Sequence, residues 1–189
     1  MTPAIVVLDA CVLFPAPLRS LLMYLAVADL FRARWTNDIH EEWMQNVQEK
    51  YPDISRQQTE RIRDLMNAHV RDCLVAGYEP LIENITLPDP DDRHVLAAAI
   101  HCEASLILTF NLKDFPPATL NPYGISAAHP DEFLSSQLQS APETFCESVR
   151  RQRCSLKNPP KSVEEFLAAL NAQRLPQTVA ALRTFQDWI

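Results

Sequence analysis

Short apolar runs alternate with longer amphipathic stretches over most of this chain. The first run, AIVVL at residues 4–8, is continuous, as expected of a strand that is buried on both faces of a parallel sheet. Further short strands are predicted at residues 34–36, 81–83, 105–109 and 125–128. Because strands alternate with helical segments, the pattern indicates a parallel α/β sheet flanked by helices.

Helices are predicted where apolar residues recur at helical spacing and where Pro, Ser or Asp stands at the start. They are expected at residues 17–31, 38–49, 55–71, 91–103, 130–139, 142–151, 162–172 and 176–188. No strand is predicted after residue 129. The Pro-rich, basic stretch 154–161 is typical of a linker to a C-terminal helical hairpin.

Length and composition indicate one domain of ordinary size with an appendage. The chain has 189 residues, of which 47% are hydrophobic, so it can bury a core. It has no signal-like N-terminus and no apolar run near the roughly 20 residues that a membrane span needs. Its five cysteines form no CxxC pair, so we expect a reduced, cytoplasmic protein. Two glycines are too few for a P-loop or a GxGxxG dinucleotide turn, which excludes both.

Charge is distributed unevenly around a formal net charge of −7. Residues 1–149 contain 10 Lys/Arg and 21 Asp/Glu, whereas residues 150–189 contain 7 and 3. Five of those seven basic residues lie in the acid-free segment RRQRCSLKNPPK, namely Arg150, Arg151, Arg153, Lys157 and Lys161. Such a segment on an acidic body can attract a polyanion or dock an acidic partner, and it can equally be a solvated loop between helices.

Two acidic residues follow predicted buried strands. Asp9 comes directly after AIVVL, and Asp114 follows LILTF in a loop that also contains Asn111. In open parallel sheets, ligands bind beyond the carboxyl ends of the strands, so these side chains are expected at one edge. Asp or Asn at such a place can also serve only as a turn former that bonds the local backbone.

The segment TNDIHEEW holds two adjacent acids with different expected roles. Asp38 and Glu41 have the spacing of a capping box, which gives Glu41 a structural task. The apolar stripe of this helix points nearly opposite Glu41, whereas Glu42 lies on its flank. A side chain on the flank of a packed helix can reach an interior cleft, so Glu42 is the predicted site residue.

The run DPDD at residues 89–92 makes a good helix start without any catalytic role. Asp89 can cap the helix, proline suits its first position, and acids in the first turn interact favourably with the helix dipole. A third acid exceeds this role, since like charges repel unless a cation neutralises them. Asp92 stands one turn before the buried face of HVLAAAI and is the predicted site residue. Arg93 and His94 follow it and could meet a phosphate or only begin a solvated helix.

Together, Asp9, Glu42, Asp92 and Asp114 predict a divalent-metal site. Proteins bind Mg²⁺ or Mn²⁺ with carboxylate oxygens that come from separate parts of the chain. Such a site typically hydrolyses phosphodiester bonds. Thr109, at the end of its strand, could donate a hydrogen bond to Asp9 or simply suit a strand.

The patterns VVLDACVLFP, WTNDIHEEW, LPDPDDRHVLAAAI and ILTFNLKDF resemble a PIN domain of the kind found in VapC-type bacterial toxins. The resemblance covers roughly residues 4–134 and closes with HPDEFL. It implies a three-layer α/β fold with a five-stranded parallel sheet, in the order 3-2-1-4-5, flanked by helices. With it we expect a PIN-like nuclease domain at residues 1–134 and a C-terminal helical extension at residues 135–189. That extension is longer than in compact toxins of this type.

The resemblance also implies an endoribonuclease that depends on Mg²⁺ or Mn²⁺. Its catalytic residues would be Asp9, Glu42, Asp92 and Asp114. Three of them, Asp9, Asp92 and Asp114, would bind the metal, with Asn111 as a further ligand. Many relatives carry Asp where Asn111 stands, and the amide supplies an oxygen without a charge, so it would hold a cation less strongly.

A VapC-type protein would be the toxin of a type II toxin–antitoxin pair. The implied partners are an RNA substrate and a small antitoxin protein, and dimers are common in this family. The residues predicted to contact RNA are Arg93, Arg150, Arg151 and Arg153.

Other functions are compatible with parts of the sequence. Asn111 raises the alternative of a catalytically weak PIN domain that serves as an RNA-binding or protein-interaction module. A flap-type DNA nuclease is disfavoured because no helical arch or DNA-binding motif is evident. A phosphatase is disfavoured because no second acid stands two residues after Asp9. Cys11 has no visible His to activate it as a nucleophile, so we expect it to pack.

Overall fold

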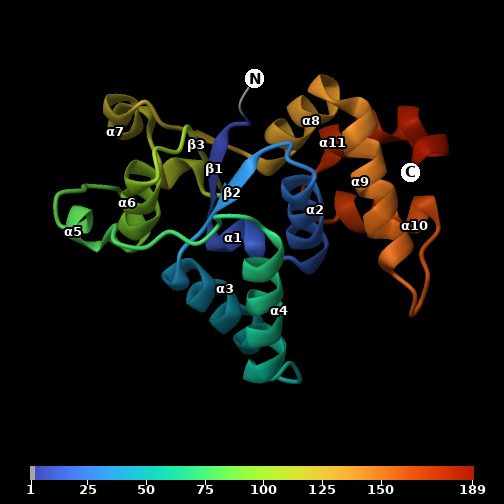
Figure 1. Ribbon diagram of the computed structural model, residues 1–189, viewed down its shortest axis with the longest axis horizontal. Helices are drawn as coiled ribbons and strands as arrows, with labels where there is room; N and C mark the ends of the chain where they lie inside the picture. The colour runs from blue at the N-terminus through green and yellow to red at the C-terminus, as the bar shows by residue number, and fades with distance from the viewer. Residues whose placement is uncertain (1–2) are drawn as a thin grey trace.

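Four parallel strands form the centre of the protein in a computed structural model that describes residues 3–189 (Figure 1). They are β1 (Ile5–Leu8), β2 (Arg32–Arg34), β3 (Leu106–Leu108) and β4 (Ser126–Ala128), in the order β2-β1-β3-β4. In β1, Val7 pairs with Arg34 on one side and with Ile107 on the other. Its side chain and that of Ile107 are fully buried, as the continuous apolar run predicts.

The expected parallel sheet flanked by helices is confirmed, but the number and order of its strands are not. Among residues 3–189 the sheet has four strands rather than five, so the predicted order 3-2-1-4-5 is wrong. The strand expected at 81–83 is instead part of the short helix α5 (Glu79–Ile82), because Pro80 in the first turn suits a helix start. Beside β2, one parallel bridge joins Trp35 to Leu74 without forming a strand.

Helices lie on both sides of the sheet. In Figure 1, α6 lies to the left of β1 and α2 to the right, and α6 packs against β1 and β3. The elements of this part are α1 (Ala10–Leu13), α2 (Ala16–Val27), α3 (Asn37–Lys50), α4 (Arg56–His69), η1 (Pro90–Asp92), α6 (Arg93–His101), η2 (Leu112–Asp114), α7 (Pro117–Leu120) and η3 (Asn121–Tyr123).

Two predicted boundaries shift for local reasons. The second strand was expected at 34–36, but it ends at Arg34 because Thr36 caps α3 by accepting a hydrogen bond from Ile39 N at 3.1 Å. The first long helix was expected to reach residue 31, but α2 ends at Val27. Asp29 then adopts the left-handed conformation (φ 57°) that often terminates a helix.

The C-terminal part is helical throughout and packs on the sheet domain. It contains α8 (Pro130–Ser140), α9 (Pro142–Ser155), α10 (Val163–Asn171), α11 (Pro176–Leu182) and η4 (Arg183–Trp188). Helix α9 packs against α2, and α11 packs against α8. The single helix expected at 176–188 is divided between α11 and η4. Helix α9 also extends to Ser155, into the predicted linker.

One buried carboxylate of α8 holds α11 in place within the C-terminal part. Asp131 is 2% exposed, and its oxygens accept hydrogen bonds from Gln177 N (2.9 Å), Thr178 N (2.8 Å) and Thr178 Oγ1 (2.8 Å). These groups form the first turn of α11, whose amides have no partner within the helix. Asp131 therefore caps a helix 46 positions away in the sequence. The proposed boundary at residue 134 falls inside α8, and the division of the chain stays a prediction.

Within residues 3–189, none of the helices has both the length and the apolar character needed to cross a membrane. All five cysteines are free. Cys73 and Cys146 are buried in the core, whereas Cys154 is exposed.

Candidate active site

Asp9 lies at the carboxyl end of β1 and is 3% exposed. It precedes α1, but its side chain makes no capping hydrogen bond to that helix. Instead, its Oδ2 accepts hydrogen bonds from Thr109 Oγ1 at 2.6 Å and from Cys11 Sγ at 3.0 Å. Of the two roles open to Thr109, the hydrogen bond to Asp9 is present, and Asp9 does not cap the helix that follows it. The carboxylate is held in one orientation at the point where β1 and β3 end.

The DPDD run divides its two roles between two residues. Asp89 accepts a hydrogen bond from Asp91 N at 3.0 Å and so caps the helical start. Asp92 makes no side-chain capping hydrogen bond. The predicted surplus of acids is thus real, and Asp92 is the carboxylate that the helix start does not use.

The pKa of Asp92 shows which other acids lie nearby. Burial, followed in order of size by the negative charges of Asp9, Asp89, Asp114 and Glu42, raises this pKa to about 7. Charges affect one another strongly only over short distances in a partly buried site. The carboxyl edge therefore brings together acids from four separate segments of the chain.

The two adjacent glutamates point to different surroundings. Oε1 of Glu42 lies 2.8 Å from His94 Nε2, at the start of α6. Glu41 instead forms an exposed ion pair with Arg56 of α4, at 2.6 Å. Glu42 therefore faces the acidic edge, in agreement with the helical phase read from the sequence.

The structural task predicted for Glu41 is wrong. The N-cap of α3 is Thr36, so Asp38 stands inside the first turn and does not form a capping box with Glu41. Asp38 Oδ2 accepts a hydrogen bond from the hydroxyl of Tyr78 at 2.7 Å instead. A threonine hydroxyl two residues earlier satisfies the same first-turn amides, which is why Asp38 is free for Tyr78.

His94 is the residue whose role the sequence did not reveal. Its side chain is buried and contacts Glu42 rather than facing solvent at a helix start. Burial disfavours the protonated ring, but the hydrogen bond and charge of Glu42 outweigh this, so the pKa of His94 is raised. In the sequence, only the position of His94 two residues after Asp92 hinted at a role in the site. That spacing does not show that His94 contacts Glu42 of α3.

Asp114 and Asn111 lie in the loop after β3. Asp114 is 9% exposed, and its nearest cation is the exposed Lys113, whose Nζ lies 3.9 Å from Oδ1. Asn111 is exposed, and its backbone N–H donates to Thr109 Oγ1 at 2.9 Å. Its side chain makes no capping hydrogen bond. Both side chains are thus free of local structural tasks of the kind that loop Asx residues usually perform.

The chemistry of these groups fits an oxygen-liganded divalent cation. Within residues 3–189, no three His, Cys, Asp or Glu side chains are close enough to form a complete set of metal ligands. The acids nevertheless act on one another, because several of their charges raise the pKa of Asp92. Carboxylates that repel in this way are neutralised most directly by Mg²⁺ or Mn²⁺, which prefer oxygen ligands. The site therefore fits such an ion in donor type and charge.

The chain matches the PIN domain family over residues 5–113. It belongs to that family. The match includes Asp9, Glu42, Asp92 and Asn111, and it ends one residue before Asp114. This PIN protein also matches the VapC50 C-terminal domain over residues 130–184, so its helical extension has a family of its own.

A Mycobacterium tuberculosis protein named "Putative ribonuclease VapC50" is 42% identical to this PIN protein over 107 residues. The aligned part covers 57% of this chain and 62% of that protein, so it spans less than two thirds of the relative. Together with the two family matches, this similarity identifies a VapC-type PIN protein. No solved structure matches the chain.

Cys11 donates a hydrogen bond to Asp9 in this PIN domain, and its environment does not favour a nucleophilic thiolate. Burial raises the pKa of its thiol strongly, and the charge of Asp9 and the hydrogen bond to it act in the same direction. A thiol in that state is not a thiolate at neutral pH. The Sγ atom also accepts the backbone N–H of Phe110 at 3.2 Å, so Cys11 packs between the ends of β1 and β3.

The basic residues predicted to contact RNA do not gather at the acidic edge. Arg150 and Arg151 both pair with Glu147 on α9, at 2.9 Å and 3.6 Å. Arg153 donates to the backbone oxygens of Lys161 and Ile189. Figure 1 places α9 and α6 on opposite sides of β1 and β2.

Arg93, the fourth predicted RNA contact, is the first residue of α6, directly after Asp92. It makes no ion pair with any residue in the part of the chain that the structure describes. Contact with RNA by these four residues stays a prediction.

Proposed function

We propose that this protein is a divalent-metal-dependent endoribonuclease that hydrolyses RNA phosphodiester bonds. The observation that carries the proposal is the convergence of Asp9, Glu42, Asp92 and Asp114 at the carboxyl edge of a PIN-family sheet. None of the three aspartates caps a helix, so helix capping does not account for their collection. The name of the M. tuberculosis relative supports ribonuclease activity as the reaction to test.

Asp9, Asp92 and Asp114 are the residues that would hold the metal, with the amide oxygen of Asn111 as a neutral ligand. When bound, Mg²⁺ or Mn²⁺ would neutralise charge that develops on the phosphate and make the attacking water more acidic. Thr109 and Cys11 fix Asp9 through one oxygen only, which leaves Oδ1 for a ligand.

Glu42 is the proposed general base. His94 binds its Oε1, so Oε2 remains to accept a proton from the attacking water. A base held by a second side chain loses less conformational freedom when the substrate is bound. His94 thus acts as a positioning residue for Glu42 in this proposal.

The test is cleavage of a structured RNA by the purified protein, with Mn²⁺ or Mg²⁺ and with EDTA. Asp9→Asn and Asp92→Asn should each lower cleavage by orders of magnitude, because they remove a metal-binding charge. Asp91→Asn is the matched control, since Asp91 is exposed in the same turn and its side chain forms no hydrogen bond or ion pair with any of residues 3–189. Equal cleavage by wild type and both site variants would rule out this nuclease mechanism. RNA binding without cleavage would favour the alternative module that Asn111 raises.

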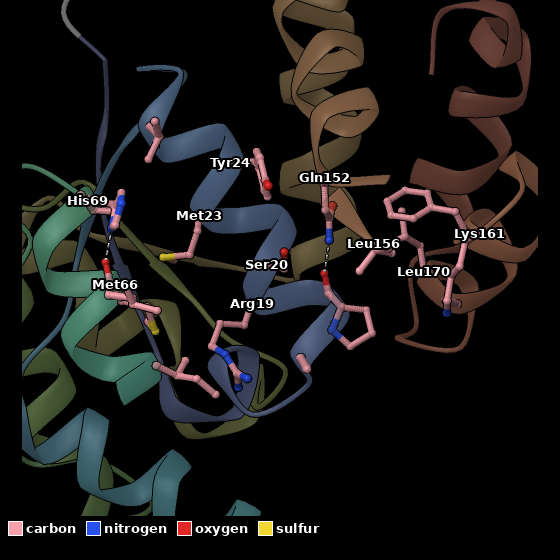
Figure 2. Close-up of a pocket in the computed structure, with 18 residues that line it drawn as sticks. Arg19, Ser20, Met23, Tyr24, Met66, His69, Gln152, Leu156, Lys161 and Leu170 are labelled. Atoms are coloured by element: carbon pink, nitrogen blue, oxygen red, sulfur yellow. Dashed lines mark hydrogen bonds between the residues drawn. The ribbon is translucent and has the colours of Figure 1, made fainter. Parts of the chain in front are cut away.

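We also propose that the protein is a toxin that pairs with a small antitoxin. An apolar groove of about 700 Å³ lies between α2, α4 and the C-terminal extension (Figure 2). Its walls include Met23 on α2, Leu65 on α4 and Leu170 on α10. Exposed apolar side chains along a groove are typical of a helix-binding surface.

The charged groups of this groove favour an acidic partner. Arg19 is 8% exposed, and its guanidinium donates only to the backbone oxygens of Leu13 (2.6 Å) and Phe14 (3.2 Å). No acidic residue lines the groove, whereas Lys161 does. An amphipathic helix with a carboxylate beside its apolar face would complement both features.

A further inference from the structure

We propose that Arg174, which the C-terminal extension carries, binds a phosphate of the RNA beside the candidate active site. The inference rests on the proposed nuclease function and assigns part of its substrate-binding surface. Arg174 stands between α10 and α11, and its Cζ lies 4.9 Å from the centroid of the Phe110 ring. The extension therefore reaches the loop that follows β3.

Phe110 is close to the acidic edge in the chain and in space. It follows Thr109, which donates to Asp9 at 2.6 Å, and its own N–H donates to Cys11 Sγ at 3.2 Å. The guanidinium of Arg174 thus stacks on Phe110, and the residue before Phe110 in the chain, Thr109, hydrogen-bonds Asp9. This places a cation on the flank of the site that is nearest β4.

His129 completes this surface. Its ring centroid lies 5.1 Å from that of Phe110 in an edge-to-face arrangement with an interplanar angle of 70°. His129 Nδ1 accepts a hydrogen bond from Asp131 N at 3.1 Å, so the proton of the neutral ring is assigned to Nε2. Arg174, Phe110 and His129 together present a cation, an aromatic face and a ring N–H at the ends of β3 and β4. Single-stranded RNA is bound by such combinations of phosphate contacts and base stacking.

Arg174 is exposed and forms no ion pair with any residue among 3–189. Arg183 of the same extension pairs with Glu164 at 2.9 Å, and Arg150 pairs with Glu147. Stacking on a ring leaves the N–H groups at the edge of a guanidinium available for a phosphate. The guanidinium of Arg174, held over Phe110, is therefore free to bind an anionic ligand.

The surroundings hold Arg174 in place. Leu175, the next residue, is fully buried, and the following turn is capped by Asp131. Arg174 has a left-handed backbone (φ 62°), but Asp29 and Glu103 end their helices in the same way. The left-handed backbone of Arg174 is thus a common helix ending in this chain. What distinguishes Arg174 is the position of its side chain over Phe110.

The experiment measures binding of a fluorescent single-stranded RNA oligonucleotide in EDTA, where no metal-dependent cleavage occurs, over a series of salt concentrations. Arg174→Gly is the principal variant, because glycine suits a left-handed backbone and should leave the fold at least as stable. It should weaken binding on the order of fivefold or more and lower the log–log salt slope by about 0.7, the value for one phosphate contact. Arg174→Lys should keep the slope, and Arg183→Ala, the matched control, should change neither quantity.

The outcomes separate this inference from the proposed function. If wild type binds RNA and cleaves it with Mn²⁺, but Arg174→Gly binds with the same affinity and slope, the role of Arg174 is disproved and the nuclease stands. If wild type neither binds nor cleaves RNA, both proposals fail together. An equal loss in Arg183→Ala would show that general positive charge, rather than the place of Arg174, attracts the RNA.

Discussion

Nε2 of His94 lies 2.8 Å from Oε1 of Glu42 and joins the start of α6 to the middle of α3 at the acidic edge. His94 follows Asp92 by two residues, so this one contact sets two of the site acids relative to each other. It also distinguishes Glu42 from Glu41, which the same helix presents to Arg56 on the outside.

Glu42→Gln should abolish metal-dependent RNA cleavage and leave the fold intact, because it removes the proposed base. Glu41→Gln is the matched change one position away. It breaks only an exposed ion pair, so it should cost less than about 1 kcal/mol in the free energy of unfolding and spare activity. Cleavage assays and chemical denaturation of both variants check this. Loss of activity in Glu41→Gln alone would contradict the assignment of the base.

Asp92 should make the metal-free protein less stable as the pH rises. Its pKa is raised from an ordinary value of 3.8 to about 7 in the folded protein, so the folded state binds more protons between these values than the unfolded state. Stability contributed by protonated Asp92 is therefore present at low pH and is lost as the pH rises through about 7.

The measurement is thermal unfolding in EDTA at pH 5 and pH 8. Asp92→Asn should unfold at a higher temperature than wild type at pH 8, with a smaller difference at pH 5. Mn²⁺ should stabilise wild type more than the variant, because an ion that binds only the folded state raises its stability. Identical pH dependence in the two proteins would show that burial and the neighbouring charges do not raise the pKa of Asp92.

Asp131→Ala should destabilise the protein by about 2–3 kcal/mol, because it leaves the first amides of α11 buried without acceptors. Glu132→Ala, at the exposed next position, should change stability by less than about 0.5 kcal/mol. Urea denaturation gives both values. The proposed nuclease function does not depend on this result. If Asp131→Ala were as stable as Glu132→Ala, Asp131 would not be what holds α11 in place.

Leu65→Asp should weaken binding of the antitoxin, which we expect the neighbouring reading frame to encode, on the order of tenfold or more. The substitution places a charge in the apolar groove, where Leu65 is 50% exposed. Leu74→Asp is the control, because Leu74 is 45% exposed but lies outside the groove. Titration calorimetry measures the affinities, and RNA cleavage by the free protein should be equal in both variants. If both changes weakened binding equally, the antitoxin would not dock specifically in this groove.

The sequence predicted best where one local pattern decides the outcome. The continuous run before Asp9 identifies the buried central strand, and strand ends of a parallel sheet share an edge, so Asp9 and Asp114 could be placed together. The helical phase also separated Glu42, which contacts His94, from Glu41, which pairs with Arg56, although the catalytic role of Glu42 stays a prediction. The capping box failed because TNDIHEE offers two overlapping caps, Thr36 and Asp38, and the choice depends on Tyr78 from a distant segment.

Features that depend on contacts between distant segments could not be predicted from the sequence. Nothing local marks His94 as a partner of Glu42, because that contact joins two helices 52 residues apart. The position of Arg174 over Phe110 likewise follows from how α11 is fastened to α8. The basic segment drew attention by its composition, yet its arginines mostly bind neighbours within the extension.

The contact between Asp131 and Thr178 has a consequence for the order in which the protein is synthesised. Thr178 is translated 47 positions after Asp131 and long after the four acids of the acidic edge. A nascent chain that already carries every carboxylate still lacks the helix turn that seats Arg174 beside them. The proposed ribonuclease is made next to ribosomal RNA and messenger RNA, and its full RNA-binding surface would form only late in its own translation.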